Sequence, residues 1–570
     1  MFILCGVINK RGFMFIRSKK NGERTYLQLV ENERQGSKVI QKVHLTLGRL
    51  DQLQQNGHLD SLLRSGLRFS QRLTVLDAHK RGQCTTTSTR KIGATLLLEK
   101  LWKEIGIDKV LQSLLHDRHF EFPVERVLFA AVLQRLFCPG SDRWGEKWMR
   151  QYAIDGIEEV ELHHFYRTMG WLGAVSFGAP EYWTHTPRRI KDDIEERLFD
   201  FRRSLFSDLS VVFMDTTSLY FEGEGGVYLG QYGNSKDHRP DLKQLVVAII
   251  LDGEGNPICS EILPGNTTDV TTLIPVAERL KNRFGIEKVC IVADRGMISD
   301  ETIDKLNELH WEYILGVRMR RCTEVRNDVL LRGGKFTEIF PEREKAKDPS
   351  PLKVKEVKVG KHRYVVCHNE EQARKDRHDR NAIIESLAEQ LKQGDKSLVG
   401  NKGYRRYLKS QGEHFSIDEE RIESEELFDG KWVLRTNTDM PAKDIALKYK
   451  QLWTVEEIFR TMKSILETRP IYHKCDETIA GHVFCSFLAL LVRKKLQDHI
   501  ESRGWTLEWA EIIRDVDAVS EVSVEHAGQS FVLRTETKGA AGKAFQAAGV
   551  ALPPVLREGQ MRGTTPEPCP

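Results

Sequence analysis

Two acidic residues each end a short apolar run that is rich in β-forming residues. Asp215 ends residues 210–215, and Asp294 ends residues 289–294. Carboxylates at the ends of neighbouring strands meet at one edge of a sheet, where a ligand or a metal ion can bind. Because Asp is also common as a structural residue in loops after strands, a catalytic and a capping role both stay open on this pattern alone.

A third acid, Glu456, lies in a long helix that we predict to begin near Pro441, a residue suited to a first helical turn. Tyr449, Glu456 and Lys463 follow one another at intervals of seven residues. Seven residues are two turns less about 20°, so the three side chains should share one face, which Arg460 widens. An apolar stripe runs beside them, formed by Ile445, Leu452, Val455, Phe459, Met462 and Leu466. We therefore expect this helix to pack on a sheet with Glu456 at its margin; the alternative is an amphipathic helix whose polar face is merely solvated.

Three carboxylates suit Mg²⁺ or Mn²⁺, which prefer oxygen ligands. Two such ions roughly 3.5–4 Å apart can activate a nucleophile and stabilise a leaving oxygen in phosphoryl transfer. No G-x-x-x-x-G-K-[ST] loop occurs, so we do not expect the phosphate to come from a nucleoside triphosphate. We interpret Asp269 as the N-cap of a following helix, and Glu457, which points about 100° away from Glu456, as the weaker ligand.

The elements around these acids follow an α/β order. We predict strands at 210–215, 242–252, 257–263, 289–294 and 313–317, with helices at 269–283 and 299–310, the latter capped by Ser299. The order is three strands, helix, strand, helix, strand. Residues 321–440 are more polar, and we interpret them as a β-rich insertion with strands near 353–367 and 431–436 and a charged helix near 370–393.

The remaining chain divides by pattern. Residues 24–33 and 38–47 predict a β-hairpin, 49–80 has helical spacing, and 92–205 is dense in helical apolar periodicity. The last 30 or so residues, rich in Gly, Ala and Pro, predict a loose tail. The expected domains are 1–80, 81–205, 206–320, 321–440, 441–535 and 536–570.

Composition excludes several classes of protein. The 570 residues are 40% hydrophobic and 29% charged, which excludes wholesale disorder, and no apolar run approaches the roughly 20 residues of a membrane span. The ten cysteines form no C-x-x-C pair, so we expect no zinc ribbon and a reducing cytoplasm. Both Met1 and Met14 remain candidate start residues.

Charge is concentrated at one end of the chain. Residues 1–80 hold 14 Lys and Arg against 6 Asp and Glu, although the net charge of the whole chain is only +4. A basic segment on a near-neutral body suggests a polyanionic partner, most simply nucleic acid. A solvated basic surface is the alternative.

Several separated segments together carry a family resemblance. They are MDTTSLYFEGEGG (214–226), SKDHRPDLKQ (235–244), LPGNTTD (263–269) and VADRGM (292–297). With the acids and the strand order, they make residues 14–535 resemble the DDE insertion-sequence transposases of ribonuclease H-like fold. The branch that the chain resembles has a helix signature Tyr-x₂-Arg-x₃-Glu-x₆-Lys. Tyr449, Glu456 and Lys463 match it, whereas Leu452 stands in place of Arg, which removes an expected cation.

The resemblance implies an α/β, ribonuclease H-like mixed sheet with flanking helices, and an enzyme of cut-and-paste DNA transposition. Asp215, Asp294 and Glu456 would hold two Mg²⁺ ions, for which Mn²⁺ could substitute. Tyr449 and Lys463 would contact phosphates of the cleaved DNA end. Partners would be double-stranded DNA, as terminal inverted repeats and target, and a second copy in an active homodimer. The protein would act in the bacterial cytoplasm at the nucleoid.

Four further residues are candidate DNA contacts, and all but Arg460 have a structural role as the alternative. Arg460 and His238 are candidates for phosphate contacts, but the loop of His238 could equally be a turn fixed by Pro240. Trp311 and Trp432 could stack on a flipped base, or could be core residues.

Two other functions remain open: a ribonuclease H-like nuclease, and a DNA-binding relative without catalysis. The three intact acids argue against the second, and Leu452 argues mildly for it. A hydrolase of small phosphates would leave the basic segment without a role.

Overall fold

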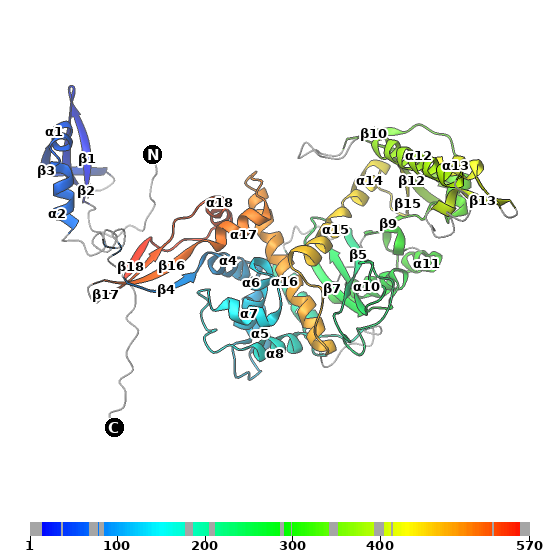
Figure 1. Cartoon of the computed structure of the whole chain (residues 1–570), viewed down its shortest axis with the longest axis horizontal. Coiled ribbons are helices and arrows are strands. Elements are labelled where there is room, and N and C mark those ends of the chain that lie inside the picture. Colours follow the sequence, from blue (N-terminus) through cyan, green and yellow to red (C-terminus); the bar gives the residue numbers. More distant parts are fainter. Residues whose placement is uncertain are drawn as a thin grey trace. The chain divides into compact units, whose positions relative to one another are not determined.

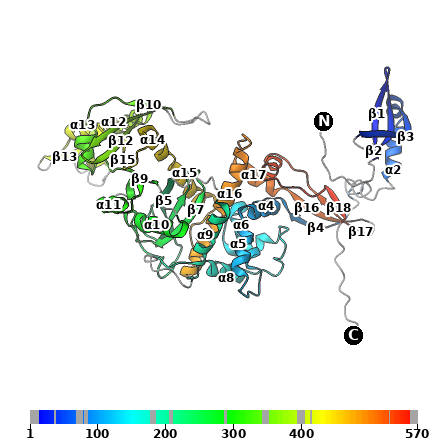
Figure 2. The same ribbon diagram turned by 180° about the vertical axis from the view of Figure 1, so that it is seen from behind.

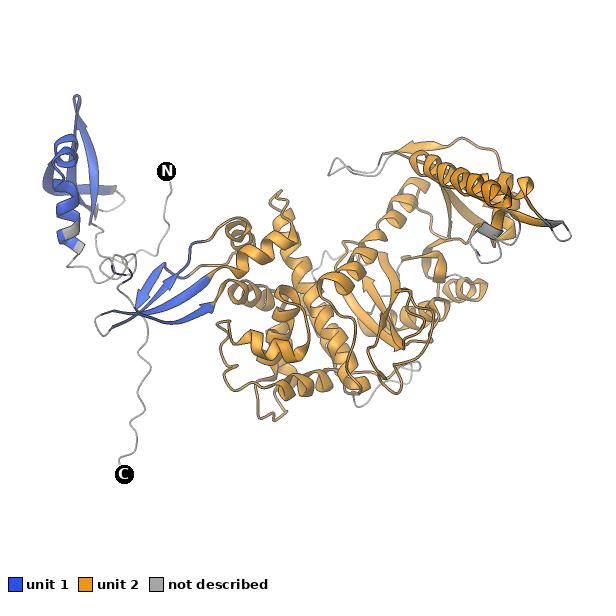
Figure 3. Cartoon of the chain, in the orientation of Figure 1, with its two compact units in different colours: residues 1–90, 520–536, 553–570 blue, residues 91–519, 537–552 orange. Residues whose placement is uncertain are grey.

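The computed structural model describes most of the chain in two compact units. The described residues are 14–35, 38–67, 78, 82, 85–176, 186–203, 211–285, 290–297, 299–340, 351–392, 404–411, 414–526 and 529–558. One unit comprises residues 1–90, 520–536 and 553–570, and the other residues 91–519 and 537–552 (Figure 3).

The first unit holds two small sheets. One has the order β1 (Met14–Asn21), β2 (Arg24–Gln35), β3 (Lys38–Arg49) and is followed by α1 (Leu50–Gln55) and α2 (His58–Leu67). The predicted hairpin is thus confirmed as β2 and β3. The other sheet has the order β18 (Leu556–Glu558), β17 (Gln529–Arg534), β16 (Ser520–His526), β4 (Thr85–Lys91).

The helical region predicted at 92–205 is confirmed. It contains α4 (Gly93–Ile105), α5 (Ile107–Leu115), α6 (Val124–Phe137), α7 (Asp142–Met149), α8 (Leu162–Gly173) and α9 (Ile190–Arg202). Three C-terminal helices complete the second unit: α16 (Asp476–Glu501), α17 (Trp509–Asp517) and α18 (Ala540–Ala548). The expected loose tail is therefore wrong for α18 and β18, whereas residues 559–570 lie outside the described residues.

The long helix α16 is the centre of the second unit. It packs against α8 and α6, and in both views the α4–α8 helices lie on one side of it and the mixed sheet on the other (Figures 1 and 2). Close approach to α8 requires glycine, because a Cβ on Gly481 would lie 2.0 Å from the carbonyl oxygen of Met169. Among the described helices none is long and apolar enough to cross a membrane.

The second unit is built on a nine-stranded mixed sheet of order β10-β11-β12-β15-β9-β8-β5-β6-β7. Its first elements in chain order are β5 (Val211–Tyr220), β6 (Gln244–Leu251), β7 (Pro257–Pro264), α10 (Asp269–Phe284), β8 (Cys290–Ala293), α11 (Asp300–Glu308) and β9 (Glu312–Gly316). The predicted order of three strands, helix, strand, helix, strand is confirmed. Strands β5, β8 and β9 are parallel and the β5-β6-β7 meander is antiparallel, as in a ribonuclease H-like α/β fold.

The segment expected as an insertion extends this same sheet. Its strands are β10 (Thr337–Ile339), β11 (Leu352–Val359), β12 (His362–Asn369) and β15 (Lys431–Thr436), and β15 pairs with β9. The helices α12 (Glu370–Lys392) and α13 (Glu419–Glu426) and the hairpin of β13 (Leu408–Gln411) and β14 (His414–Ile417) complete it.

The two faces of the sheet are covered by different helices. Phe213 and Ile249 belong to a core shared with α14 (Ala442–Lys450), α15 (Trp453–Arg460) and α16. Met214 and Ile250 belong to the opposite core, with α10 and α11. Because side chains alternate along a strand, odd positions of β5 face α14–α16.

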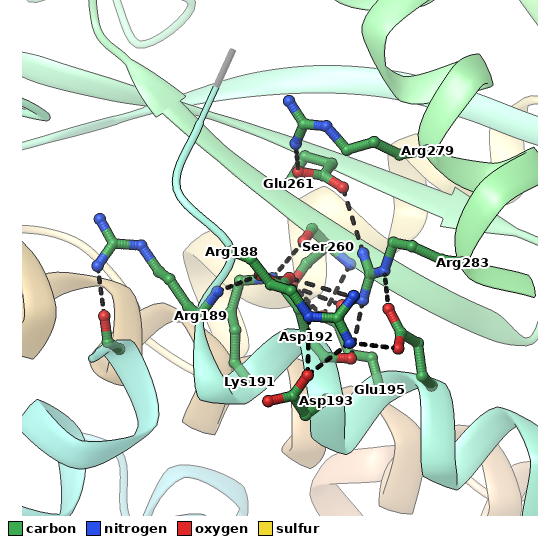
Figure 4. Close-up of polar contacts among 12 residues, drawn as sticks. Arg188, Arg189, Lys191, Asp192, Asp193, Glu195, Ser260, Glu261, Arg279 and Arg283 are labelled. Carbon is green, nitrogen blue, oxygen red and sulfur yellow. Dashed lines mark hydrogen bonds and ion pairs between the residues drawn. The ribbon is translucent and has the colours of Figure 1, made fainter. Parts of the chain in front are cut away.

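A buried ion network anchors α9 to the sheet (Figure 4). Arg283 of α10 has no exposed side-chain surface and donates to Glu195 of α9 at 2.8 Å and to Glu261 of β7 at 3.3 Å. Lys191 of α9 donates to the carbonyl oxygen of Ser260 at 2.6 Å. The helical region is therefore fixed to the mixed sheet through paired buried charges, and removing one partner of such a pair is strongly destabilising.

The single helix predicted from Pro441 is interrupted, and that prediction was wrong in this respect. Pro441 is the N-cap of α14, which ends at Lys450; a turn at 451–452 separates it from α15, and a π-helical turn, Thr461–Ile465, follows. Tyr449, Glu456 and Lys463 therefore lie on three successive segments, and a seven-residue interval does not place them on one straight face.

Candidate active site

Asp215 and Asp294 lie beside each other at adjacent parallel strands. Met214 of β5 is paired with Ala293 of β8, and each acid is the next residue. Asp215 is at an odd position of β5, so it faces the side of the sheet that α14 and α15 cover. The expected convergence of these two acids is present; their catalytic role stays a prediction.

Asp215 is a perturbed carboxyl group. Burial raises its pKa to about 6, the ammonium of Lys236 and the backbone N–H of Thr216 oppose this shift, and the charges of Asp294 and Asp269 add to it. The Thr216 N–H donates to Asp215 Oδ1 at 2.7 Å, and Lys236 Nζ lies 4.0 Å from the same oxygen. A surplus of negative charge at a buried position is an environment that attracts a cation.

Asp269 belongs to this cluster, and its interpretation as an N-cap was wrong. The N-cap of α10 is Thr268. Asp269 Oδ1 instead accepts from the Thr216 hydroxyl at 2.5 Å, and its Oδ2 lies 3.3 Å from Lys236 Nζ. The loop after Asp294 also approaches, because a Cβ on Gly296 would lie 3.1 Å from Asp269 Oδ2.

Sequence reasoning missed Lys236, although its segment SKDHRPDLKQ stood out. Lys236 donates to the carbonyl oxygen of Thr216 at 2.7 Å, and its own N–H donates to Ser218 Oγ at 2.8 Å. The loop before β6 is thereby fastened to β5 at two residues that follow Asp215. The only signal was the presence of a cation in a segment that resembles the transposases.

Tyr449 contacts an acid directly. Its hydroxyl donates to Asp294 Oδ1 at 3.0 Å. Burial and the charge of Asp294 raise the pKa of Tyr449, so the hydroxyl keeps its proton and remains a donor. Gly316 of β9 makes room for the ring, because a Cβ there would lie 2.3 Å from the Tyr449 hydroxyl oxygen.

Glu456 is exposed on α15. The helix packs on β5 and β6 through its buried residues Val455 and Phe459. Glu457 is partly buried. Burial lowers the pKa of Arg493 of α16, and the charge of Glu457 opposes that shift. Glu456 is therefore the more exposed acid of the two. Among the described residues, one group of three ligating side chains has all its ligand atoms within 4.8 Å of one another, and it is Asp142, His473 and His482. Asp215, Asp294 and Glu456 are more widely spaced than that.

The predicted DNA contacts lie in different surroundings. Lys463 donates to Asp237 Oδ1 at 2.9 Å, and burial lowers its pKa. Arg460 is exposed. His238 is exposed, with a left-handed backbone (φ 57°), in a turn where the Ser235 hydroxyl accepts from backbone N–H groups.

The two tryptophans proposed for base stacking are covered. Trp311 has no exposed surface and belongs to the core beneath α10 and α11. Trp432, on β15, is partly buried and packs against the opposite core. Trp311 is therefore a core residue, as the alternative interpretation had it.

The donor set fits a hard divalent cation. Asp215, Asp294, Asp269 and Glu456 offer carboxylate oxygens only. Asp215 and Asp294 are partly buried, and the ammonium of Lys236 lies beside Asp215 and Asp269. Asp215 and Asp294 follow the last parallel pair of β5 and β8 in a ribonuclease H-like sheet, a place where a bound divalent cation would act on phosphodiesters.

Comparison with known families places the chain more narrowly. The model "Transposase DDE domain" matches residues 206–492, half of the chain, and "IS1634 family transposase, N-terminal domain" matches residues 15–80. The chain therefore belongs to the DDE transposases of insertion sequences. A search of curated proteins found no match.

Proposed function

We propose that this transposase moves its element by cut-and-paste transposition, with phosphodiester hydrolysis followed by strand transfer at the element ends. Asp215, Asp294 and Glu456 are the proposed catalytic and metal-binding residues. The observation that carries the proposal is the parallel register of β5 and β8, which sets Asp215 and Asp294 side by side. Glu456 would approach from α15, the helix that packs on β5.

Two Mg²⁺ ions held by these carboxylates would supply nucleophile activation and stabilisation of the leaving oxygen. The protein's own groups would prepare the site. Tyr449 holds the Asp294 carboxylate through its hydroxyl, and Lys236 balances the charge of Asp215 and Asp269. Asp215 and Asp294 are thus each oriented by neighbouring groups, as metal ligands usually are.

Contacts to DNA are proposed for Lys463, Arg460 and His238. Tyr449 is proposed to act at the same DNA end through the Asp294 carboxylate that its hydroxyl holds. Two of these, Arg460 and His238, are exposed and so accessible to a phosphate. The basic segment 1–80 is proposed to add sequence-independent affinity for the terminal repeats and the target. A homodimer, each copy engaging one end, is proposed for the active complex, which would work at the bacterial nucleoid.

A cleavage assay tests the proposal. A plasmid carrying the gene with its native flanking DNA is incubated with purified protein and Mg²⁺. Asp215→Asn and Glu456→Gln should abolish cuts at the flanking ends, whereas Glu457→Gln, a matched loss of one charge on the same helix, should retain them. Cuts scattered over any DNA would support a nuclease instead. Tight end binding without any cut would support the non-catalytic relative.

A further inference from the structure

A cavity of about 620 Å³ lies outside the acid cluster, in the second unit. Its walls come from the start of α7, from Tyr166 of α8, from the segment 467–478 and from His482 of α16. None of the catalytic acids lines it, and the function proposed above gives it no role.

Asp142, His473 and His482, which line the cavity, belong to a hydrogen-bonded polar cluster. His482 Nδ1 lies 3.0 Å from the Arg135 guanidinium and accepts a hydrogen bond from it. His482 Nε2 lies 3.1 Å from the carbonyl oxygen of Thr468 and donates to it, so both ring nitrogens have partners. Asp142 is paired with His473 at 3.2 Å and faces Arg135 at 3.8 Å. The charge of Asp142 is balanced by that of Arg135, and the hydrogen bonds hold the side chains on this side of the cavity in place.

The rim combines aromatic faces with cations. Tyr166 and Tyr472 are 41% and 63% exposed, so their rings are open to a ligand. Arg143 and Lys474 are exposed beside them and also line the cavity. Aromatic rings next to cations are the elements with which proteins hold single-stranded nucleic acid, because every base can stack and every nucleotide carries a phosphate.

The cavity is joined to the catalytic strand. Ile471 forms a parallel bridge to Phe221 and donates its N–H to the carbonyl oxygen of Tyr220, the last residue of β5. Tyr220 is five residues from Asp215, a distance of about 17 Å at strand rise. That span equals about five base steps of duplex DNA, so a strand held at Asp215 could extend to the end of β5, where the cavity segment is attached.

We propose that this cavity binds one unpaired nucleotide of a DNA strand, with the base against Tyr166 and Tyr472 and the phosphate on Arg143 and Lys474. The proposal rests on the proposed function only in taking DNA as the substrate. It needs neither metal nor cleavage.

The test is a binding comparison in EDTA. The probes are a blunt fluorescent duplex and the same duplex with a short single-stranded thymidine extension. Wild-type protein should bind the extended duplex more tightly. Tyr472→Ala should reduce that preference by about fivefold or more, the smallest loss expected when a base–aromatic stack is removed, with blunt-duplex affinity unchanged. Trp144→Ala, an exposed aromatic of α7 outside the cavity, should keep the preference.

The phosphate contact is tested separately. Lys474→Gln should lower the salt dependence of binding to the extended duplex by about 0.7 in the log–log slope, whereas Lys147→Gln, an exposed lysine of α7, should not. The extended duplex should also protect the exposed thiol of Cys475 from alkylation, read on its own peptide by mass spectrometry.

Equal binding of both duplexes by wild-type protein overturns the proposal. So does a preference that survives Tyr472→Ala, or one that Trp144→Ala also abolishes. These outcomes leave the transposase function standing, because that function is tested by metal-dependent cuts. Absence of binding to any duplex would instead refute both.

Discussion

Replacing Asp237 by Asn should strengthen DNA binding, because its carboxylate holds two cations that a DNA phosphate could otherwise use. Asp237 lies 2.9 Å from Lys463 Nζ and 3.3 Å from Arg469 Nε, and its side chain is only 8% exposed. Lys463 is the lysine that the family resemblance assigns to DNA phosphates. In the free protein, Asp237 therefore occupies the position of that anion.

The size of the effect follows from counterion release. Each phosphate that a cation neutralises adds about 0.9 to the slope of log affinity against log salt. Two released cations would add about 1.8, so raising salt from about 50 to about 200 mM should weaken the variant roughly 12-fold more than wild type. Asparagine keeps the shape of the side chain and an oxygen that Lys463 can donate to, so the local fold should persist.

Fluorescence anisotropy with duplex DNA from the flanks of the gene, measured over that salt range, gives both affinity and slope. Asp117→Asn is the control, because it changes the net charge equally at a side chain that is 96% exposed. A variant with weaker binding and an unchanged slope would show that Asp237 positions Lys463 for DNA. No change at all would show that neither cation contacts DNA.

Three further predictions concern single contacts. Tyr449→Phe should slow cleavage about 10- to 100-fold without changing DNA affinity, because it removes a hydrogen bond to the Asp294 carboxylate; a loss of affinity instead would make Tyr449 a phosphate contact. Arg283→Met should lower the free energy of unfolding by about 3–5 kcal/mol in denaturant titrations, since it leaves the buried carboxylates Glu195 and Glu261 with one cation fewer, and a loss below about 1 kcal/mol would contradict this. His482, whose pKa burial lowers to about 3, stays neutral in the folded state while the unfolded chain takes up a proton below pH of about 6.5. Stability should therefore fall with pH below that value, by up to about 1.4 kcal/mol per unit, and His482→Gln should flatten this slope between about pH 6.5 and 5; parallel profiles would refute the assignment.

The sheet was predictable because its determinants are local. The runs before Asp215 and Asp294 are short, apolar and rich in β-forming residues, and both form strands. The predicted end of the first strand at Asp215 was wrong, because β5 continues to Tyr220 along its pairing with β6. The N-cap Ser299 was also correct, since its hydroxyl accepts from the Thr302 N–H at 3.0 Å.

The errors arose where distant residues decide the structure. Ala540–Ala548 was interpreted as a loose tail from composition, but Asp515, 25 residues earlier, accepts from the Ala540 N–H at 2.8 Å and starts the helix. Asp269 was interpreted as a cap because the helix after it was visible in the sequence, whereas its partners Thr216 and Lys236 were not. A contact between side chains far apart in the sequence produces no hydrophobic periodicity from which it could be predicted.

Leu452 shows how the break between α14 and α15 changes the meaning of a sequence difference. In the branch that the chain resembles, Arg stands here, which suggested a lost phosphate contact. Leu452 lies at the turn between the two helices, is 6% exposed and packs in the same core as Val455 and Phe459. An arginine at this position would place a charged group in an apolar core, which is costly without a partner. Lys463 and Arg469 already supply two cations near the end of β5, through Asp237 and the ring of Tyr220. Leu452 is thus part of the fold that holds α15 on the sheet, and restoring Arg would disturb the position of Glu456 before it could add a contact to DNA.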